Sequence, residues 1–419
     1  RGAVVGCALV RVLRAAGYAV PTESYSNDAG AQVHKLALSV RAIAKGESVP
    51  DGGYGGAYVH DLVAELKRDR PELLASGDDP ALAEECVARM MAGIRRTLDA
   101  LGVEFDVYFS ERSLTAEGKL DRVLKTLGDG GHLEERDGAL FFKSSSAGED
   151  DKDRVLRKTN GEYTYFAPDL AYHQDKLLRG FNRLIDVWGA DHHGYAPRMR
   201  AGLEALGLPK ESFEVLFIQL VKLLKYNPET GKKEEVKFSK RAGNFITIDE
   251  VIEEVDRASG QRHAGRDAVR FLFLTRSHES PVEFDLDLAS KQTVENPVFY
   301  AQMSHARMCS IFDRVRTSED MAPARSAGAL SIPEQYDEKL AEKLTLPEER
   351  DILALCDSFA ELIRDAAAAR GPHRVVFFVQ ELAQAFASYF TRMQKVHDEP
   401  ILPQKSYRDA HPDWVARWD

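Results

Sequence analysis

The sequence lacks any apolar run that approaches the roughly 18 residues that a helix needs to cross a bilayer. Its first residues, RGAVVGCALVRVLRAAGY, also lack the layout of a secretory signal peptide. Cysteine is scarce, and the four cysteines are far apart and form no C-x-x-C pair, which argues against a zinc ribbon or a disulfide framework. We therefore expect a cytoplasmic protein without a membrane partner.

Positive charge is also in short supply, because 67 Asp and Glu residues outnumber 56 Lys and Arg residues and leave a net charge of -11. Phosphate backbones favour positive surfaces, so this balance argues against indiscriminate binding of nucleic acid. A nucleic-acid partner would have to be held by local patches, and the segment 221–241, with seven Lys or Arg against three Glu, is one candidate. A solvated polar face is the alternative interpretation of that segment.

A chain of 419 residues is long enough for two or three domains. Up to about residue 290, strand-like runs alternate with helical ones, which predicts an α/β sheet. The expected helices are one at the start of the chain, ending near Gly17, one over 31–45 and one over about 80–101. The expected strands are residues 18–22 and the runs VEFDVYF, LIDVWG, EVLFIQLV and FITI.

Beyond about residue 296, apolar residues recur only at helical spacing, which predicts a helical bundle. The clearest stripe consists of Val375, Val379, Leu382, Phe386, Phe390 and Met393. The stretch TSEDMAPARSAGALSIPEQ is rich in Ser, Ala and Pro, so it predicts a loop between two of these helices.

A basic cluster, VKFSKRAGN, occupies residues 236–244. Lys237 and Lys240 are three apart on a loop that contains Gly243, so they could contact a polyphosphate from two sides. Two such charges would stabilise the charge that develops during transfer at an α-phosphate. A solvated turn is the alternative interpretation of the cluster by itself.

The stretch WGADHHGY directly follows the apolar run LIDV. Ligands of open α/β sheets bind at the carboxyl ends of strands, so Asp191, His192 and His193 fall where a binding loop is expected. A metal site is a rival interpretation, but adjacent histidines point apart and no third ligand follows at i+4. We favour nucleotide or substrate contact, with structural hydrogen bonding as the alternative.

The stretch TYFAPDLAYH places Tyr165 and Asp169 four residues apart, so they share a face of a helix or turn that begins near Pro168. An Asp carboxylate accepts a guanidinium in a bidentate fork, and a Tyr ring can lie against the same planar group. Spacing alone favours the plainer alternative, an Asp stabilised near a helix start and a core Tyr. The earlier stretch SNDAGAQ, residues 26–32, predicts only a turn and an N-cap for the following helix.

Seven stretches taken in order resemble the arginyl-tRNA synthetases of bacteria, over essentially the whole chain. They are YSNDAGAQ, LGVEFDVYFSERSL, TYFAPDLAYHQDKL, VWGADHHGY, VKFSKRAGNF, AVRFLFLTRS and NPVFYAQMSHARMCSI. The resemblance implies a Rossmann-type class I catalytic domain over residues 1–290. It also implies an all-α helical-bundle anticodon-binding domain over residues 291–419, of the type named for an Asp-Ala-Leu-Arg motif.

The same resemblance implies an arginine–tRNA ligase. Such an enzyme activates arginine with ATP and Mg²⁺ to arginyl-adenylate and then transfers the arginyl group to the 3′ end of tRNA(Arg). It would need no protein-bound metal, and we expect a monomer. The resemblance implies that Lys237 and Lys240 are catalytic. It implies that Tyr165 and Asp169 bind the arginine side chain and that Asp191 binds its amino group. The residues it implies for ATP binding are His192, His193, Gly194, Lys237, Ser239, Lys240 and Arg241.

The chain departs from the family pattern in several places. Phe238 stands where the lysine loop of class I synthetases has Met, and Cys7 stands where the first helix is expected to have Asp. The resemblance also implies an addition domain and a His-x-Gly-His motif before Arg1, and further helices after the last residue, so we expect a fragment of a complete enzyme. Two alternatives stay open: a catalytically inactive synthetase-like protein that binds tRNA, and a nucleotidyltransferase acting on a small molecule, which the helical C-terminal part argues against.

Overall fold

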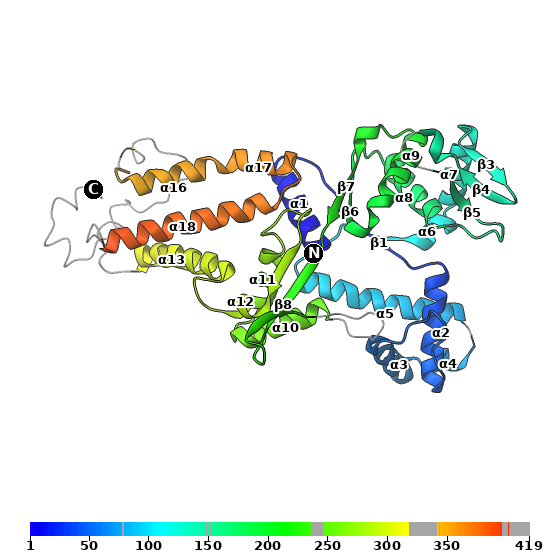
Figure 1. Cartoon of the computed structure of the whole chain (residues 1–419), viewed down its shortest axis with the longest axis horizontal. Helices are drawn as coiled ribbons and strands as arrows, with labels where there is room; N and C mark the ends of the chain where they lie inside the picture. Colours follow the sequence, from blue (N-terminus) through cyan, green and yellow to red (C-terminus); the bar gives the residue numbers. More distant parts are fainter. Residues whose placement is uncertain are drawn as a thin grey trace.

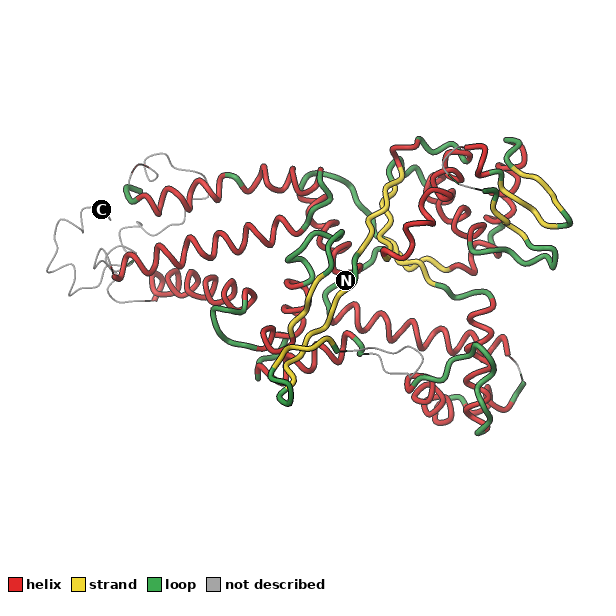
Figure 2. The backbone as a smooth tube through the Cα atoms, viewed as in Figure 1, coloured by secondary structure: helices red, strands yellow, loops and turns green. Residues whose placement is uncertain are grey.

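The computed structural model describes residues 1–77, 79–147, 150, 152–236, 246–317, 342, 344–395 and 401. The molecule is elongated, with parallel strands near its centre and a group of long helices at one end (Figure 1). Two further lobes lie at the other end, one purely helical and one mixed (Figure 2). No helix in the described part of the chain is long and apolar enough to span a membrane.

Three parallel strand pairs form the centre of the fold. They are β1 (Glu23–Ser26) with β2 (Val107–Ser110), β6 (Leu184–Gly189) with β7 (Phe213–Ile218), and β10 (Val282–Asp285) with β8 (Val221–Asn227). Parallel pairing requires crossover connections, and the chain supplies helices between the paired strands. The first helix, α1 (Gly2–Ala15), contacts β6 and buries Val5, Leu9, Val12 and Leu13. The arrangement is the Rossmann-type α/β fold.

A helical insertion separates β1 from β2. It comprises α2 (Ala31–Lys45), α3 (Ala57–Asp69), α4 (Pro71–Ala75) and α5 (Asp79–Ala100). Its core is its own, built around Val40, Val59, Leu66 and Leu82. A pair of side chains, which we call the clasp, joins the starts of the two strands: the Asp106 carboxylate, just before β2, accepts hydrogen bonds from the amide of Thr22, just before β1, at 2.7 Å and from its hydroxyl at 2.8 Å.

The mixed lobe follows β2. Its elements are α6 (Glu111–Ala116), α7 (Lys119–Asp129), β3 (Leu133–Arg136), β4 (Ala139–Phe142), η1 (Ser144–Ala147), β5 (Arg154–Arg157), α8 (Phe166–Leu178), η2 (Ala190–Tyr195), α9 (Ala196–Ala205) and η3 (Lys210–Ser212). Strands β3, β4 and β5 form an antiparallel sheet. Helices α7, α8 and α9 share one apolar cluster with β4, in which Leu127, Phe142, Leu170 and Met199 are almost fully buried.

A second set of elements surrounds β8 and β10: β9 (Lys232–Glu235), α10 (Ile248–Ser259), α11 (Ala264–Leu272) and α12 (Leu286–Ser290). Helix α10 begins with a capping box in which Thr247 and Glu250 satisfy each other's backbone amides. Gly265 lets α11 approach α10, because a Cβ on it would lie 2.2 Å from the Ile252 carbonyl oxygen. The Arg270 guanidinium on α11 donates to the carbonyls of Leu101 and Gly102 at 2.6 and 2.9 Å, which fixes the end of the insertion.

The long helices at the far end are α13 (Pro297–Thr317), α16 (Pro347–Asp357), α17 (Phe359–Ala368) and α18 (His373–Lys395). Helix α18 packs against α13, α16 and α17, with Phe378 against Phe359. Helix α17 contacts α1, and the Arg370 guanidinium pairs with Glu214 of β7 at 3.0 Å. The bundle is therefore anchored directly on the parallel strands.

Most of the expected elements are present: the first helix, the helices over 31–45 and near 80–101, and strands within LIDVWG and EVLFIQLV. Three local predictions were wrong. Residues 18–22 form no strand, because the first strand starts at Glu23, after Pro21. The run FITI is no strand within its described residues, because Thr247 caps a helix there. The stripe on α18 is shifted, because Val379 is 37% exposed whereas Val376 and Phe378 are buried. The predicted loop of Ser, Ala and Pro lies almost wholly outside the described residues.

Candidate active site

Asp169 lies in the first turn of α8, where the helix dipole favours a negative charge. The start of the helix is fixed on its outer side by Thr164, whose hydroxyl donates to the Val155 carbonyl of β5 at 2.6 Å. The Asp169 carboxylate is half-buried and accepts a hydrogen bond from the Tyr195 hydroxyl. Burial raises the pKa of Asp169, while the bond from Tyr195 and the charge of His173 oppose that rise.

Two further carboxylates converge on Asp169 from the ends of β1 and β2. Burial raises the pKa of Glu111 to about 7, and the charges of Asp169 and Asp28 act in the same direction. Asp28 is held in place, since it accepts hydrogen bonds from the Ser110 hydroxyl at 2.5 Å and the Arg112 amide at 3.0 Å. Three acids so arranged repel one another, and a bound cation would relieve that repulsion.

Glu111 was missed in the sequence, although a signal for it was present. The stretch VYFSER places Glu111 directly after an apolar strand-like run, and the carboxyl ends of parallel strands are where ligand sites form. The stretch SNDAGAQ was expected to form only a turn and an N-cap; it does supply the N-cap, but Asp28 within it has a further place in the acidic cluster that was not predicted. Gly30 caps α2 without a side-chain bond, and its φ of 79° lies in the left-handed region that glycine tolerates.

Tyr165 immediately precedes α8, one turn before Asp169, whose amide donates to the Tyr165 carbonyl at 3.2 Å. Its side chain is 65% exposed, so the alternative of a core tyrosine is wrong. The ring is open to solvent, one turn before Asp169, which forms an acidic cluster with Asp28 and Glu111.

The loop WGADHHGY lies at the carboxyl end of β6, where it was expected, and forms η2. Asp191 and His192 are mostly exposed, with 3.8 Å between the carboxylate and the ring Nε2. The ring of His193 stacks on Phe217 of β7 at 3.6 Å between centroids. Gly194 has nothing within 4 Å of an added Cβ, so it leaves open space beside these side chains.

Tyr195 joins this loop to the acidic cluster, because its hydroxyl bonds Asp169 while its ring lies 5.6 Å from Trp188 of β6. The structure therefore brings together the acidic cluster and the η2 loop. The residues of the basic loop, Lys237, Ser239, Lys240 and Arg241, lie outside the described residues. Among the residues that are described, no group of three His, Cys, Asp or Glu side chains could hold a metal ion.

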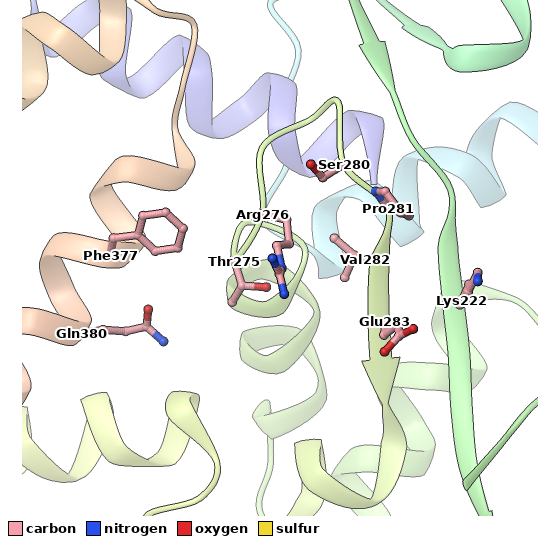
Figure 3. A pocket seen from close by; sticks show the side chains of 9 residues that line it. All are labelled: Lys222, Thr275, Arg276, Ser280, Pro281, Val282, Glu283, Phe377 and Gln380. Atoms are coloured by element: carbon pink, nitrogen blue, oxygen red, sulfur yellow. The ribbon is translucent and has the colours of Figure 1, made fainter.

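A separate hollow of about 750 Å³ lies between β10 and α18 (Figure 3). Arg276, Phe377 and Gln380 line it from the two sides, and Lys222 and Glu283 contribute opposite charges. It is lined by none of the predicted site residues. Its place at the junction of the strands and the bundle distinguishes it from the acidic cluster.

Comparison with known proteins identifies the class and then the family. The fold and the appended helices are those of the class I aminoacyl-tRNA synthetases. A methionyl-tRNA synthetase from Mycobacterium tuberculosis shares the fold at 13% identity: it matches 90% of this chain and 84% of its own, with a TM-score of 0.52. A family model described as the DALR anticodon binding domain matches residues 301–408.

The arginine–tRNA ligase of Nitratidesulfovibrio vulgaris Hildenborough is 43% identical over 411 residues, which cover 96% of this chain and 69% of that protein. The arginine–tRNA ligase of Bacillus subtilis is 42% identical over 415 residues, covering 95% and 68%. A solved Campylobacter jejuni structure described as an arginyl-tRNA synthetase has a TM-score of 0.78 and 30% identity, and covers 99% of this chain and 85% of that one. This chain belongs to the arginyl-tRNA synthetase family, and its activity is that of an arginine–tRNA ligase.

Proposed function

We propose that the acidic cluster is the pocket for the arginine side chain, with Asp169 as the principal ligand of the guanidinium. The supporting observation is the convergence of Asp28, Glu111 and Asp169 from three separate elements. A carboxylate pairs with a planar guanidinium through two parallel bonds, which the compact ammonium of lysine cannot match. Asp169 uses Oδ2 for Tyr195, and within the described residues Oδ1 accepts no hydrogen bond, so it can face the substrate.

Asp28 contributes mainly its charge, because both of its carboxylate oxygens already accept bonds from the protein. Glu111 completes the pocket from the β2 side. Tyr165 stands at the entrance, where its exposed ring can cover the bound side chain. Asp191, mostly exposed at the end of β6, is proposed to take the ammonium group of arginine.

The η2 loop is proposed to bind ATP, the adenosine lying against His192, His193 and Gly194. The stack of His193 on Phe217 gives a flat surface, and Gly194 leaves room for the nucleotide beside it. Lys237, Ser239, Lys240 and Arg241 are proposed to hold the phosphates, with Mg²⁺ entering as part of the nucleotide substrate.

The reaction then needs positioning and charge stabilisation, and no covalent enzyme intermediate. An oxygen of the arginine carboxylate bonds to the α-phosphorus as the bond to the bridging oxygen breaks and pyrophosphate leaves. A ribose hydroxyl at the tRNA 3′ end then attacks the activated carbonyl carbon, and AMP leaves. Lys237 and Lys240 stabilise the negative charge of the first step.

We also propose residues 1–290 as the catalytic domain and residues 291–419 as the anticodon-binding domain of a cytoplasmic monomer. The family model over residues 301–408 and the change to helices from α13 onward support this division. Asn296 joins the two parts, because its buried side-chain amide donates to the carbonyls of Ala289 and Lys291 and accepts from the Val298 amide. The helices of the second domain would contact the anticodon arm of tRNA(Arg). No observation favours the alternative of an inactive tRNA-binding relative.

The pocket assignment is tested by Asp169→Asn in the full-length protein, using arginine-dependent exchange of pyrophosphate into ATP. The KM for arginine should rise about 100-fold or more, because one partner of a partly buried ion pair is lost, while the KM for ATP stays within about threefold. Asp175→Asn is the matched control, since Asp175 lies on the same helix but pairs with Lys119 at 3.0 Å away from the cluster. An unchanged KM for arginine in Asp169→Asn would refute the assignment.

A further inference from the structure

His173 lies one helical turn after Asp169 on α8 and is buried, with 3% of its surface exposed. Its ring is held between aromatic neighbours, edge-on to Tyr172 at 5.3 Å and to Phe213 of β7 at 5.5 Å. A ring so enclosed has one orientation available, and its two nitrogens face fixed partners.

Both partners of the ring are hydrogen-bond acceptors. Nδ1 lies 2.7 Å from the main-chain carbonyl oxygen of Asp169, and Nε2 lies 2.8 Å from the carboxylate of Asp186 in β6. Although burial opposes it, the ammonium of Lys176, 3.3 Å from the other carboxylate oxygen, lowers the pKa of Asp186, which favours the ionised carboxylate that can only accept. Both ring nitrogens therefore face oxygen acceptors, and this geometry assigns a proton to each nitrogen and a positive charge to the ring.

Asp186 has a second cationic partner. Lys176 on the same helix contacts the second oxygen of Asp186 at 3.3 Å, and β7 contributes only the apolar Phe213. Asp186 is thus held by two cations from α8, and the charge of His173 acts on Asp169 as well. Without the positive charge of His173, the negative charge of Asp186 would act on Asp169 with only the charge of Lys176 to offset it.

From this geometry we infer that His173 is a positioning residue for arginine recognition, which fastens the first turn of α8 to strand β6 and keeps a positive charge behind Asp169. The inference rests on the proposed role of Asp169. The bond from His173 Nε2 to Asp186 fixes the position of the Asp169 carboxylate relative to the η2 loop at the end of β6. The charge favours the ionised form of Asp169, which is the form that binds a guanidinium. Supporting residues of this kind typically change affinity by about 10- to 100-fold when lost.

A pair of substitutions in the full-length enzyme separates the bond from the charge. His173→Asn keeps a donor near the position of Nδ1 but cannot reach Asp186, so both the bond to β6 and the charge are lost. His173→Gln keeps a donor near the position of Nε2, so the bond to Asp186 is kept and only the charge is lost. The measurements are the KM values for arginine and ATP, and the part of the acid limb of kcat/KM for arginine that lies below the titration of Glu111, in pyrophosphate exchange.

His173→Asn should raise the KM for arginine about tenfold, leave the KM for ATP within about twofold and move the acid limb to higher pH. His173→Gln should restore the KM for arginine to within about threefold and still show the shifted acid limb. A merely structural role would leave the acid limb in place. The control is Gln174→Ala, the neighbouring buried residue, whose amide bonds Thr126 of α7 at 3.0 Å and which should change neither quantity.

The inference is overturned if His173→Asn leaves the KM for arginine within twofold of the parent value, if it raises the KM for ATP by the same factor as the KM for arginine, or if neither variant moves the acid limb. Should His173→Asn fail to fold, the acid limb of His173→Gln decides the matter. Asp169→Asn is measured alongside. If that variant also leaves the KM for arginine unchanged, the pocket assignment itself is wrong; if it alone raises the KM, only the role of His173 is wrong.

Discussion

Arginine binding should depend on pH through Glu111, whose pKa is raised to about 7 by burial and by the charges of Asp169 and Asp28. Below that pH, Glu111 in the free enzyme carries a proton, and a guanidinium must displace it. For a single site with this pKa, the apparent dissociation constant should be about tenfold larger at pH 6 than at pH 8. Near pH 7, arginine binding should release roughly half a proton from Glu111.

The same shift has a consequence for stability. Because the folded pKa lies above the ordinary 4.5, the folded state binds the proton more tightly than the unfolded state does. The free energy of unfolding should therefore decrease as pH rises from about 4.5 to 7. The full shift corresponds to about 3 kcal/mol, which we reduce to about 1–2 kcal/mol because Glu111 is only half-buried.

Glu111→Gln tests both consequences. In the absence of arginine the variant should be more stable than the parent at pH 8, by about 1–2 kcal/mol in urea unfolding, because it removes a repelled charge. It should also bind arginine more weakly at pH 8, and it should release fewer protons on binding in calorimetry performed in buffers of different ionisation enthalpy. An arginine affinity that is the same at pH 6 and pH 8 in the parent enzyme, or a variant less stable at pH 8, would refute this account of the cluster.

Three other predictions concern different parts of the molecule. Lys240→Ala should lower the rate of adenylate formation by about 10²–10³ with little change in the KM for arginine, measured by single-turnover kinetics; a large rise in that KM with an unchanged rate would make Lys240 a binding residue. Gly265→Ala should destabilise the protein by about 1–3 kcal/mol in urea unfolding, because its Cβ would lie 2.2 Å from the Ile252 carbonyl oxygen. Gly207→Ala is the control for backbone strain alone, because no atom lies within 4 Å of its Cβ but its φ is 94°. tRNA affinity, measured by filter binding, should fall steeply between about 50 and 200 mM salt, because phosphate contacts release counterions, and a flat salt dependence would contradict a backbone-contacting bundle.

Much of the fold was predictable because its apolar residues repeat at regular spacing. The first helix buries Val5, Leu9, Val12 and Leu13, which recur at helical spacing in the sequence. The strand LIDVWG was likewise found from a short apolar run, and its end correctly located the loop that carries Asp191 and the two histidines.

The errors arose where short patterns compete with tertiary contacts. The run FITI has strand-like composition, but Thr247 and Glu250 form a capping box that starts a helix there. Asp28 has a typical N-cap residue type, yet Ser110 and Arg112, more than 80 positions away, take its two oxygens. No local pattern contains partners at that separation in the chain.

The candidate site was predictable in part for the same reason. Asp169 and the η2 loop stood out through their neighbours in the sequence, whereas Glu111 gains its importance from burial and from Asp28 and Asp169, which the fold brings to it. The role inferred for His173 depends on the distance to Asp186, 13 residues along the chain, which only the structure supplies.

The clasp between Thr22 and Asp106 means that the helical insertion leaves and re-enters the parallel sheet at adjacent, hydrogen-bonded strands. Whatever length of chain stands between these strands, the separation of Asp28 and Glu111 is set by the register of β1 and β2 and by the bond between Asp28 and Ser110. Helices α2, α3 and α4, which pack in the insertion's own core, can therefore vary in length and sequence during evolution, whereas the end of α5 stays tied to the core around β8 through Leu101. Selection on that lobe and selection on the amino-acid pocket can then proceed largely independently within one gene.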